Sequence, residues 1–114
     1  KDLGAKAGSV LSIGTCASYG GIPAAAGSIT DCASAATVLS DAGIKTPVVN
    51  IPGCPPHPDW IVGTVAMVLI GGLGVINVDK FGRPIVFYGK QIHEKCTLRG
   101  QFDKGNFAKK LSDQ

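Results

Sequence analysis

Apolar residues along this chain fall into short runs that glycine and proline separate. The run SVLSIG at 9–14 is apolar and β-branched and ends at a glycine, which is typical of a buried strand. The run TPVVNI at 46–51 predicts a second strand, and RPIVFYG at 83–89 is interpreted as a shorter third one. Because the runs are nearly continuous rather than alternating, they predict parallel strands covered on both faces.

Two segments have the spacing of helices. The first, TDCASAATVLSDAG at 30–43, places Thr30 or Asp31 as the cap at its start and Gly43 just beyond its end. Its inner face is expected to carry Cys32, Ala35, Ala36 and Leu39.

The second helix is expected from Pro58 to about Ile70, ending at the glycine pair 71–72. Proline suits the first helical position, and the acidic Asp59 beside it favours the helix dipole. The run 60–76 is the one candidate for a membrane span, but its 17 residues include four glycines. A spanning helix needs about 20 solidly apolar residues. We therefore interpret the run as a buried core helix.

The order strand, loop, helix, strand, loop, helix, strand predicts an α/β fold with a doubly wound, mostly parallel sheet. Cys16 and Cys54 then each follow a strand, in the loop at its carboxyl end. Ligands bind at that edge in open α/β sheets. The tail from Lys90 is polar, with weak helix signals near 107–111.

The composition is apolar for a small single domain: 45% of the 114 residues are hydrophobic and 17% are charged. This indicates either a very compact core or a surface that something else covers. The net charge of +3 is mild, and the positive residues fall largely from Lys80 onward, among acids and without interleaved aromatics, which argues against nucleic-acid binding. The start, KDLGAKAGSV, has no initiating methionine and no apolar leader, so we expect a fragment or a processed chain.

Four cysteines, at positions 16, 32, 54 and 96, are far apart in the sequence. Without a CxxC pair, neither a zinc ribbon nor a thioredoxin-type motif is present. The even number of cysteines would allow a disulfide framework, although proteins of that kind are usually smaller and less aliphatic. The glycines and prolines around Cys16 and Cys54 favour a rigid thiolate site for a soft metal or an iron–sulfur cluster. Buried free thiols are the alternative.

His93 and Cys96 form an i, i+3 pair in the sequence QIHEKC, so both fall on one face of a helical turn. Such a pair can bind a metal. A surface histidine beside a packing thiol fits this short pattern as well.

Four motifs, in order and spacing, closely resemble the small subunit of nickel–iron hydrogenases, including the selenium-containing branch. They are GTCASYGGIPAA, NIPGCPPHPDWIVGT, GRPIVFYG and IHEKC. The resemblance runs from about Val10 to Phe107 and implies a flavodoxin-like sheet. Residues 1–89 are then expected to be the C-terminal part of the flavodoxin-like domain, and 90–114 the irregular start of an iron–sulfur cluster domain.

The resemblance also implies which residues bind clusters. Cys16 and Cys54 would ligate the proximal [4Fe-4S] cluster, and His93 and Cys96 the distal [4Fe-4S] cluster. The family's clusters include [3Fe-4S] as well as [4Fe-4S] types. The remaining ligands of both clusters, and all ligands of the medial one, would lie outside residues 1–114, so we expect the middle of a small subunit.

Two further residues have other interpretations. Cys32 matches no ligand position of the family and is interpreted as a packing thiol. His57 stands where many relatives carry asparagine, and we interpret it as a loop or N-cap residue.

The implied function is electron transfer during reversible H2 oxidation. The chain would hold clusters that relay electrons between the nickel–iron site of a large subunit and an external carrier, such as a cytochrome or a ferredoxin. No bond-making residue is expected in it. The family favours a periplasmic or membrane-associated location and leaves the cytoplasm open.

Two other functions are left open by the residues. The chain could be a truncated structural remnant without clusters, or an independent α/β module that uses its thiols for zinc or redox chemistry.

Overall fold

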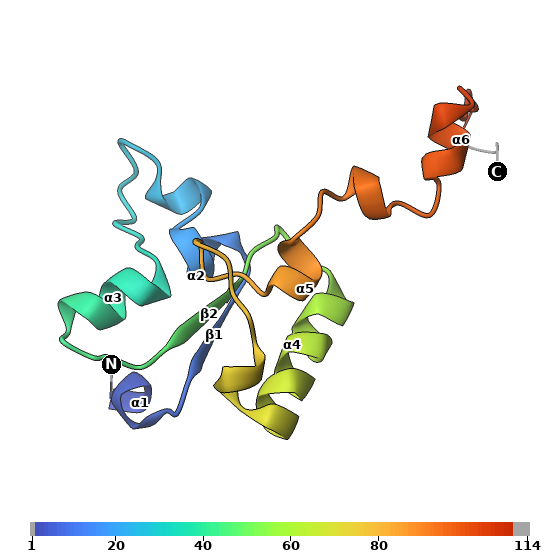
Figure 1. Cartoon of the computed structure of the whole chain (residues 1–114). Helices are drawn as coiled ribbons and strands as arrows, with labels where there is room; N and C mark the ends of the chain where they lie inside the picture. Colours follow the sequence, from blue (N-terminus) through green and yellow to red (C-terminus); the bar gives the residue numbers. More distant parts are fainter. Residues whose placement is uncertain (1, 111–114) are drawn as a thin grey trace.

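A two-stranded parallel sheet lies between helices in the computed structural model, which describes residues 2–110 (Figure 1). Strand β1 (Val10–Ile13) pairs with β2 (Val48–Ile51) in a register that sets Val10 beside Val48 and Ile13 beside Ile51. The side chain of Ile51 is fully buried. Both strands match the predicted runs, and their parallel pairing confirms that part of the prediction.

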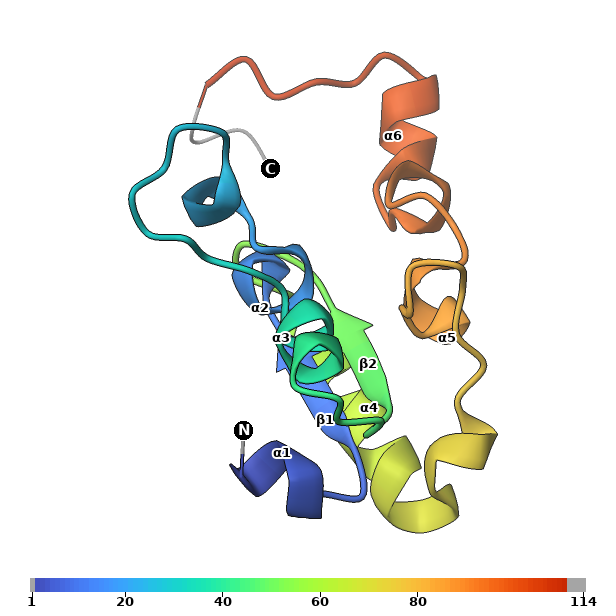
Figure 2. The same ribbon diagram turned by 90° about the vertical axis from the view of Figure 1, so that its left-hand side faces the viewer.

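Short helices make up most of the remaining regular structure. In chain order they are α1 (Asp2–Lys6), α2 (Thr15–Tyr19), the 3-10 turn η1 (Ile22–Ala24), α3 (Ala35–Asp41), α4 (Pro58–Gly71), η2 (Leu73–Val75), α5 (Ile85–Tyr88), η3 (His93–Lys95) and α6 (Arg99–Asp103). Figure 2 shows α2 and α3 in front of the sheet and α4 behind it. The strands thus have helices on both faces, as their continuous apolar character predicts.

The prediction of a third strand at 83–89 is wrong. Residues 85–88 form α5, and only an isolated antiparallel bridge between Val78 and Pro84 remains of extended pairing there. The backbone N–H groups of Tyr88 and Gly89 donate to the carbonyl oxygens of Pro84 and Ile85. A four-residue apolar run fits a strand or a helical turn equally well by its pattern, and local hydrogen bonds decide here for the helix.

Helix α3 begins later than predicted. Ser34 caps it by accepting a 3.0 Å hydrogen bond from the backbone N–H of Thr37, whereas the Thr30 hydroxyl donates to the carbonyl oxygen of Pro23. Cys32 therefore precedes the helix and is exposed, so its interpretation as a packing thiol is wrong. Leu39 is buried on the inner face as expected, and Gly43 follows the helix end with a φ of 72°.

Helix α4 has the predicted bounds. His57 is its N-cap, with Nδ1 accepting from the backbone N–H of Asp59 at 3.2 Å, and Gly72 ends the helix. The expectation of a buried core helix is only partly met, because Thr64 is fully buried while exposed side chains include Val62, Leu69 and Ile70. Within the described part of the chain, no helix is long and apolar enough to cross a bilayer.

A tight turn at 79–83 connects the end of the α4 region to α5. One carboxylate oxygen of Asp79 accepts from the backbone N–H groups of Phe81 and Arg83, and the other accepts from Nε of Arg83 at 2.7 Å. Gly82 in this turn has a φ of 73°, a conformation that glycine adopts without strain.

This turn is hydrogen-bonded to helix α2 and to strand β2. The carbonyl oxygen of Phe81 accepts from the Tyr19 hydroxyl at 3.0 Å and from Nδ2 of Asn50 at 2.9 Å. The backbone N–H of Asn50 also donates to the carbonyl oxygen of Gly82. The 79–83 turn is thereby held against the end of α2 and the middle of β2, although it is distant from both in the sequence.

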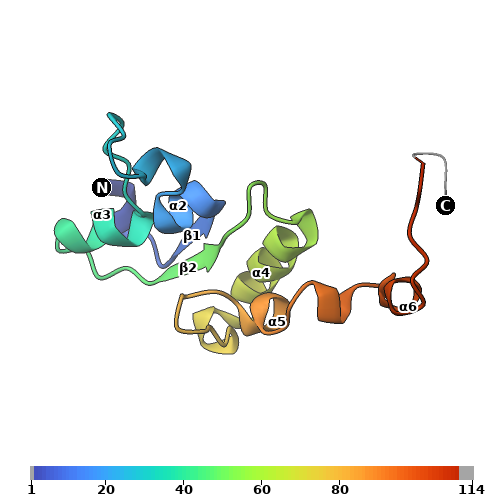
Figure 3. The same ribbon diagram turned by 90° about the horizontal axis from the view of Figure 1, so that it is seen from above.

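Beyond Gly89 the chain leaves the sheet region and every described residue is exposed (Figure 3). A hydrogen bond from Nζ of Lys95 to the carbonyl oxygen of Val86 joins η3 to α5. The radius of gyration, 17.6 Å, exceeds the roughly 13 Å of a compact domain of about this length. The expected helix near 107–111 is not formed over 107–110, and position 111 lies outside the described residues.

The Asp79 turn makes stability depend on pH. Partial burial alone would raise the pKa of Asp79, but the hydrogen bonds from Arg83 and Phe81 outweigh it and hold the pKa below its usual value. The stabilisation is therefore fully present above the pKa of the unfolded chain, about 3.9. It is lost as pH falls through the lower pKa of the folded chain. We expect Asp79→Asn to lower the free energy of unfolding at pH 7, and this deficit to shrink steadily below about pH 4.

Urea unfolding at a series of pH values measures this difference. Asp103→Asn is the matched control, because the Arg99–Asp103 pair is also spaced i, i+4 but is half exposed and contributes little. A deficit for Asp79→Asn that is the same at pH 3 and pH 7 would contradict the assignment.

Candidate metal centre

Cys16 and Cys54 lie beyond the carboxyl ends of neighbouring parallel strands. The backbone N–H of Gly14, after β1, donates to the carbonyl oxygen of Ile51 at the end of β2. Cys54 lies in a loop, as predicted, whereas Cys16 is the second residue of the short helix α2 and not part of a loop. Both thiols are exposed and free.

The residues directly before the two cysteines are bonded to each other in both directions. The backbone N–H of Thr15 donates to the carbonyl oxygen of Gly53 at 3.0 Å. The backbone N–H of Gly53 donates to the hydroxyl oxygen of Thr15 at 3.1 Å. This reciprocal pair fixes the backbone before Cys16 against the backbone before Cys54, so both thiols are presented from one strand edge.

Glycine is required close to the Cys16 sulfur. Gly21 has a φ of 61°, and a Cβ atom there would lie 2.9 Å from Sγ of Cys16. Its neighbour Gly20, with a φ of 88°, donates its N–H to the carbonyl oxygen of Cys16. The chain therefore folds back past the sulfur in a path that a larger residue would block.

The donor set suits a thiolate-bound cluster. Thiolates select soft metals and iron–sulfur clusters, and such clusters take four protein ligands. In residues 2–110 no group of three or more His, Cys, Asp or Glu side chains gathers as a metal site would require. Cys16 and Cys54 are thus a pair of exposed thiols at one strand edge, two of the four donors that such a cluster needs.

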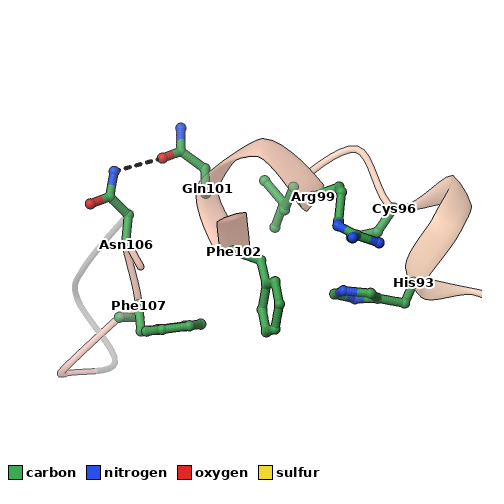
Figure 4. Close-up of a pocket in the computed structure, with 9 residues that line it drawn as sticks. His93, Cys96, Arg99, Gln101, Phe102, Asn106 and Phe107 are labelled. Carbon is green, nitrogen blue, oxygen red and sulfur yellow. Dashed lines mark hydrogen bonds between the residues drawn. The ribbon is translucent and has the colours of Figure 1, made fainter. Parts of the chain in front are cut away.

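The second candidate pair, His93 and Cys96, lies in the exposed C-terminal segment. His93 begins η3 and Cys96 follows its last residue, which agrees with the predicted helical turn. The two residues help line an open pocket of about 740 Å³. In Figure 4 the ring of Phe102 faces His93, with ring centroids 4.5 Å apart, and Phe107 continues the aromatic contact at 5.6 Å from Phe102.

Several residues of this pocket were not predicted. Arg99 lines it and pairs with Asp103 at 2.8 Å, and Phe102 supplies its aromatic wall. A sequence signal for them exists, because Arg99 and Phe102 are three residues apart and α6 places such positions on one face.

Tyr88 is a further residue that the sequence did not single out, and it contacts the Cys54 loop. Its hydroxyl donates to the carbonyl oxygen of Pro52 at 2.7 Å, and its ring meets Trp60 edge-on at 4.8 Å. Burial raises the pKa of Tyr88 to about 12, with a smaller contribution from Tyr19, so its phenol stays protonated at neutral pH.

The two candidate pairs are separate in the structure. An open pocket of about 570 Å³ lies between the Cys54 loop and the segment that leads to His93, and residues from both sides line it, Pro52 and Gly53 on one and Gln91 and Glu94 on the other. The fold thus brings Cys16 and Cys54 to one edge, and holds His93 with Cys96 in a different place.

Comparison with known proteins gives one family match and a consistent set of relatives. The family described as NADH ubiquinone oxidoreductase, 20 kDa subunit, matches residues 1–68. The periplasmic [NiFeSe] hydrogenase small subunit of Desulfomicrobium baculatum is 41% identical over 95% of this chain and 36% of its own length. The quinone-reactive Ni/Fe-hydrogenase small chain of Wolinella succinogenes is 41% identical over 96% of this chain and 29% of its own.

Solved structures agree with these relatives. The recombinant [NiFeSe] hydrogenase of Desulfovibrio vulgaris Hildenborough is similar over 98% of this chain and 43% of its own, with 49% identity and a TM-score of 0.79. The Ni-Fe-Se hydrogenase of Desulfomicrobium baculatum has a TM-score of 0.75 over 99% of this chain. The chain spans about a third of the length of the curated relatives it matches.

The Thr15–Gly53 pair yields a direct test. In Thr15→Val the side chain keeps its shape but loses the oxygen that accepts from the Gly53 N–H, so a partly buried donor is left without its partner. We expect a loss of about 1–3 kcal/mol in the free energy of unfolding. Thr15→Ser retains the hydroxyl and should lose clearly less. Denaturant titration of the three proteins measures both values, and equal losses for valine and serine would refute the role of the hydroxyl.

Proposed function

Since this chain belongs to the NADH ubiquinone oxidoreductase 20 kDa subunit family and its relatives are hydrogenase small subunits, we propose that it is the electron-transfer part of a hydrogenase. The observation that carries the proposal is the reciprocal Thr15–Gly53 pair, which holds Cys16 and Cys54 at one edge of a parallel sheet. On this proposal the chain holds clusters that relay electrons during reversible H2 oxidation, and it makes or breaks no bond of the substrate.

Cys16 and Cys54 supply two thiolates to the proximal [4Fe-4S] cluster. The chemistry that a bound cluster provides is the transfer of one electron at a time with little change in structure. The protein's contribution is to keep both sulfur atoms in place, through the Thr15–Gly53 bonds and the close passage of Gly21 beside Cys16. The other two ligands come from outside residues 1–114.

His93 and Cys96 supply two ligands to the distal [4Fe-4S] cluster. The ring contact between His93 and Phe102 restricts the imidazole, which helps to present one nitrogen to a metal. A neutral histidine in place of a thiolate leaves such a cluster less negative, which bears on its reduction potential. The medial cluster takes no ligand from this chain.

Residues 1–89 are proposed as the C-terminal part of a flavodoxin-like domain, and 90–114 as the start of the cluster domain. The change at Gly89 from a sheet covered by helices to an exposed segment supports this division. Exposed apolar side chains on α4 and its flanks support a covering partner, which on this proposal is a large subunit that carries the nickel–iron centre.

The external electron carrier on this proposal is a cytochrome or a ferredoxin. One relative is named as periplasmic, which supports a periplasmic or membrane-associated location for the assembled enzyme.

Replacement of the cysteines tests the proposal in the complete protein, purified without oxygen. We expect Cys16→Ser and Cys54→Ser each to lower the iron and acid-labile sulfide by about four atoms per molecule, the content of one cubane cluster. Cys32→Ser is the matched control, because Cys32 is also exposed but lies in the loop before α3. It should leave both contents unchanged.

The same measurements separate the alternatives. Stoichiometric zinc that is lost with Cys54→Ser would favour an independent thiol module, and iron and sulfide contents near zero in the unaltered protein would favour a structural remnant. Either result would overturn the proposed function.

A further inference from the structure

The segment before Cys54 is held from two sides. Thr15 bonds both backbone groups of Gly53, and on the other side the Tyr88 hydroxyl donates to the carbonyl oxygen of Pro52 at 2.7 Å. Proline has no backbone N–H, so this carbonyl is the only backbone group through which Pro52 can be hydrogen-bonded. The Tyr88 bond joins residues 36 apart in the chain.

Tyr88 is itself held firmly in position. The Trp60 ring packs edge-on against its ring at 4.8 Å, and the guanidinium carbon of Arg83 lies 5.4 Å from the ring centroid. Arg83 in turn is fixed by its hydrogen bonds to the carboxylate of Asp79. A ring packed between an indole and a bonded guanidinium has little freedom to turn its hydroxyl away from Pro52.

Helix α5, which ends at Tyr88, contacts both candidate ligand segments. At its end Tyr88 reaches the Cys54 loop, and at Val86 its carbonyl oxygen accepts from Nζ of Lys95 in η3. Figure 1 shows α5 beside the start of α4 and close to the loop that follows β2. The helix therefore lies where a support for that loop would be needed.

We propose that Tyr88 is a positioning residue for the cluster at Cys54, acting through the carbonyl oxygen of Pro52 to fix the direction in which the Cys54 sulfur is presented. The inference rests on the proposed function and extends it to a residue that is no ligand. On this proposal helix α5 supports the first candidate ligand pair, Cys16 and Cys54. Along the chain it also precedes the second pair, His93 and Cys96.

The test compares two hydroxyl deletions in the complete small subunit assembled with its partner. Tyr88→Phe removes only the hydroxyl and keeps the ring that Trp60 and Arg83 contact. Thr46→Val is the matched control, because the Thr46 hydroxyl also donates to a distant carbonyl oxygen, that of Gly4, at 2.7 Å. Thr46 precedes β2, at the end of the strand opposite to Cys54.

Two readouts are used: the rate of iron loss to a ferrous chelator, and the electron paramagnetic resonance spectrum of each reduced cluster. We expect Tyr88→Phe to speed iron loss from the Cys54-dependent cluster about five-fold, as for the loss of one hydrogen bond of ordinary net strength. The spectrum of that cluster should change, while that of the Cys96-dependent cluster stays as in the unaltered protein. Thr46→Val should change neither readout.

The inference is overturned if Tyr88→Phe matches the unaltered protein, or if Thr46→Val produces the same changes. If Tyr88→Phe does not accumulate, Trp60→Phe takes its place, since it keeps the hydroxyl and loosens the ring. Faster iron loss from the same cluster then supports the inference, and an unchanged rate refutes it.

Failure of the proposed function gives a different result. In that case Cys54→Ser itself leaves the iron content and the spectra unchanged. A cluster that depends on Cys54 but is indifferent to Tyr88→Phe refutes the positioning role alone.

Discussion

The candidate centre depends on the reciprocal hydrogen bonds between Thr15 and Gly53. They are the contacts that turn two separate strand ends into one site, because each bond joins the residue directly before a cysteine to its counterpart. The parallel register of β1 and β2 brings these residues level, and the buried Ile51 anchors the strand that leads to Cys54. The placement of Cys16 beside Cys54 is thus a direct extension of sheet pairing, and a change in register would separate the two thiols.

A second set of hydrogen bonds, made by Tyr19, Asn50 and Tyr88, supports this edge of the sheet. The turn built on Asp79 reaches the end of α2 through Tyr19 and the middle of β2 through Asn50, and Tyr88 then reaches Pro52. Each of these is a hydrogen bond to a backbone carbonyl oxygen, so the support acts on the backbone and leaves the sulfur atoms free. On the proposed function, such support would keep both sulfur atoms accessible to a cluster.

Local sequence signals were sufficient to predict those elements whose structure is determined within their own segment. The β-branched runs before Gly14 and Pro52 predicted both strands, and Pro58 with the glycine pair 71–72 predicted both ends of α4. The start of α3 was missed because Thr30, Asp31 and Ser34 can all cap a helix, and the contact of Thr30 with Pro23 decided among them. The partners of Thr15 and Tyr88 could not be predicted, since each lies more than 35 residues away and no local pattern records it.

The distance along the chain between the bonded partners also sets an order of events in folding. The Gly53–Thr15 bond closes a separation of 38 residues, and parallel strands cannot form from a hairpin. The entropy of closing so long a loop must be met before any contact at the edge forms, so pairing of this kind is slow relative to helix formation. In a nascent chain the helices can therefore exist while Cys16 and Cys54 are still far apart. On the proposed function, metal binding by this pair would report that the sheet has closed, and a chain with an unpaired sheet would hold two independent thiols that are open to oxidation.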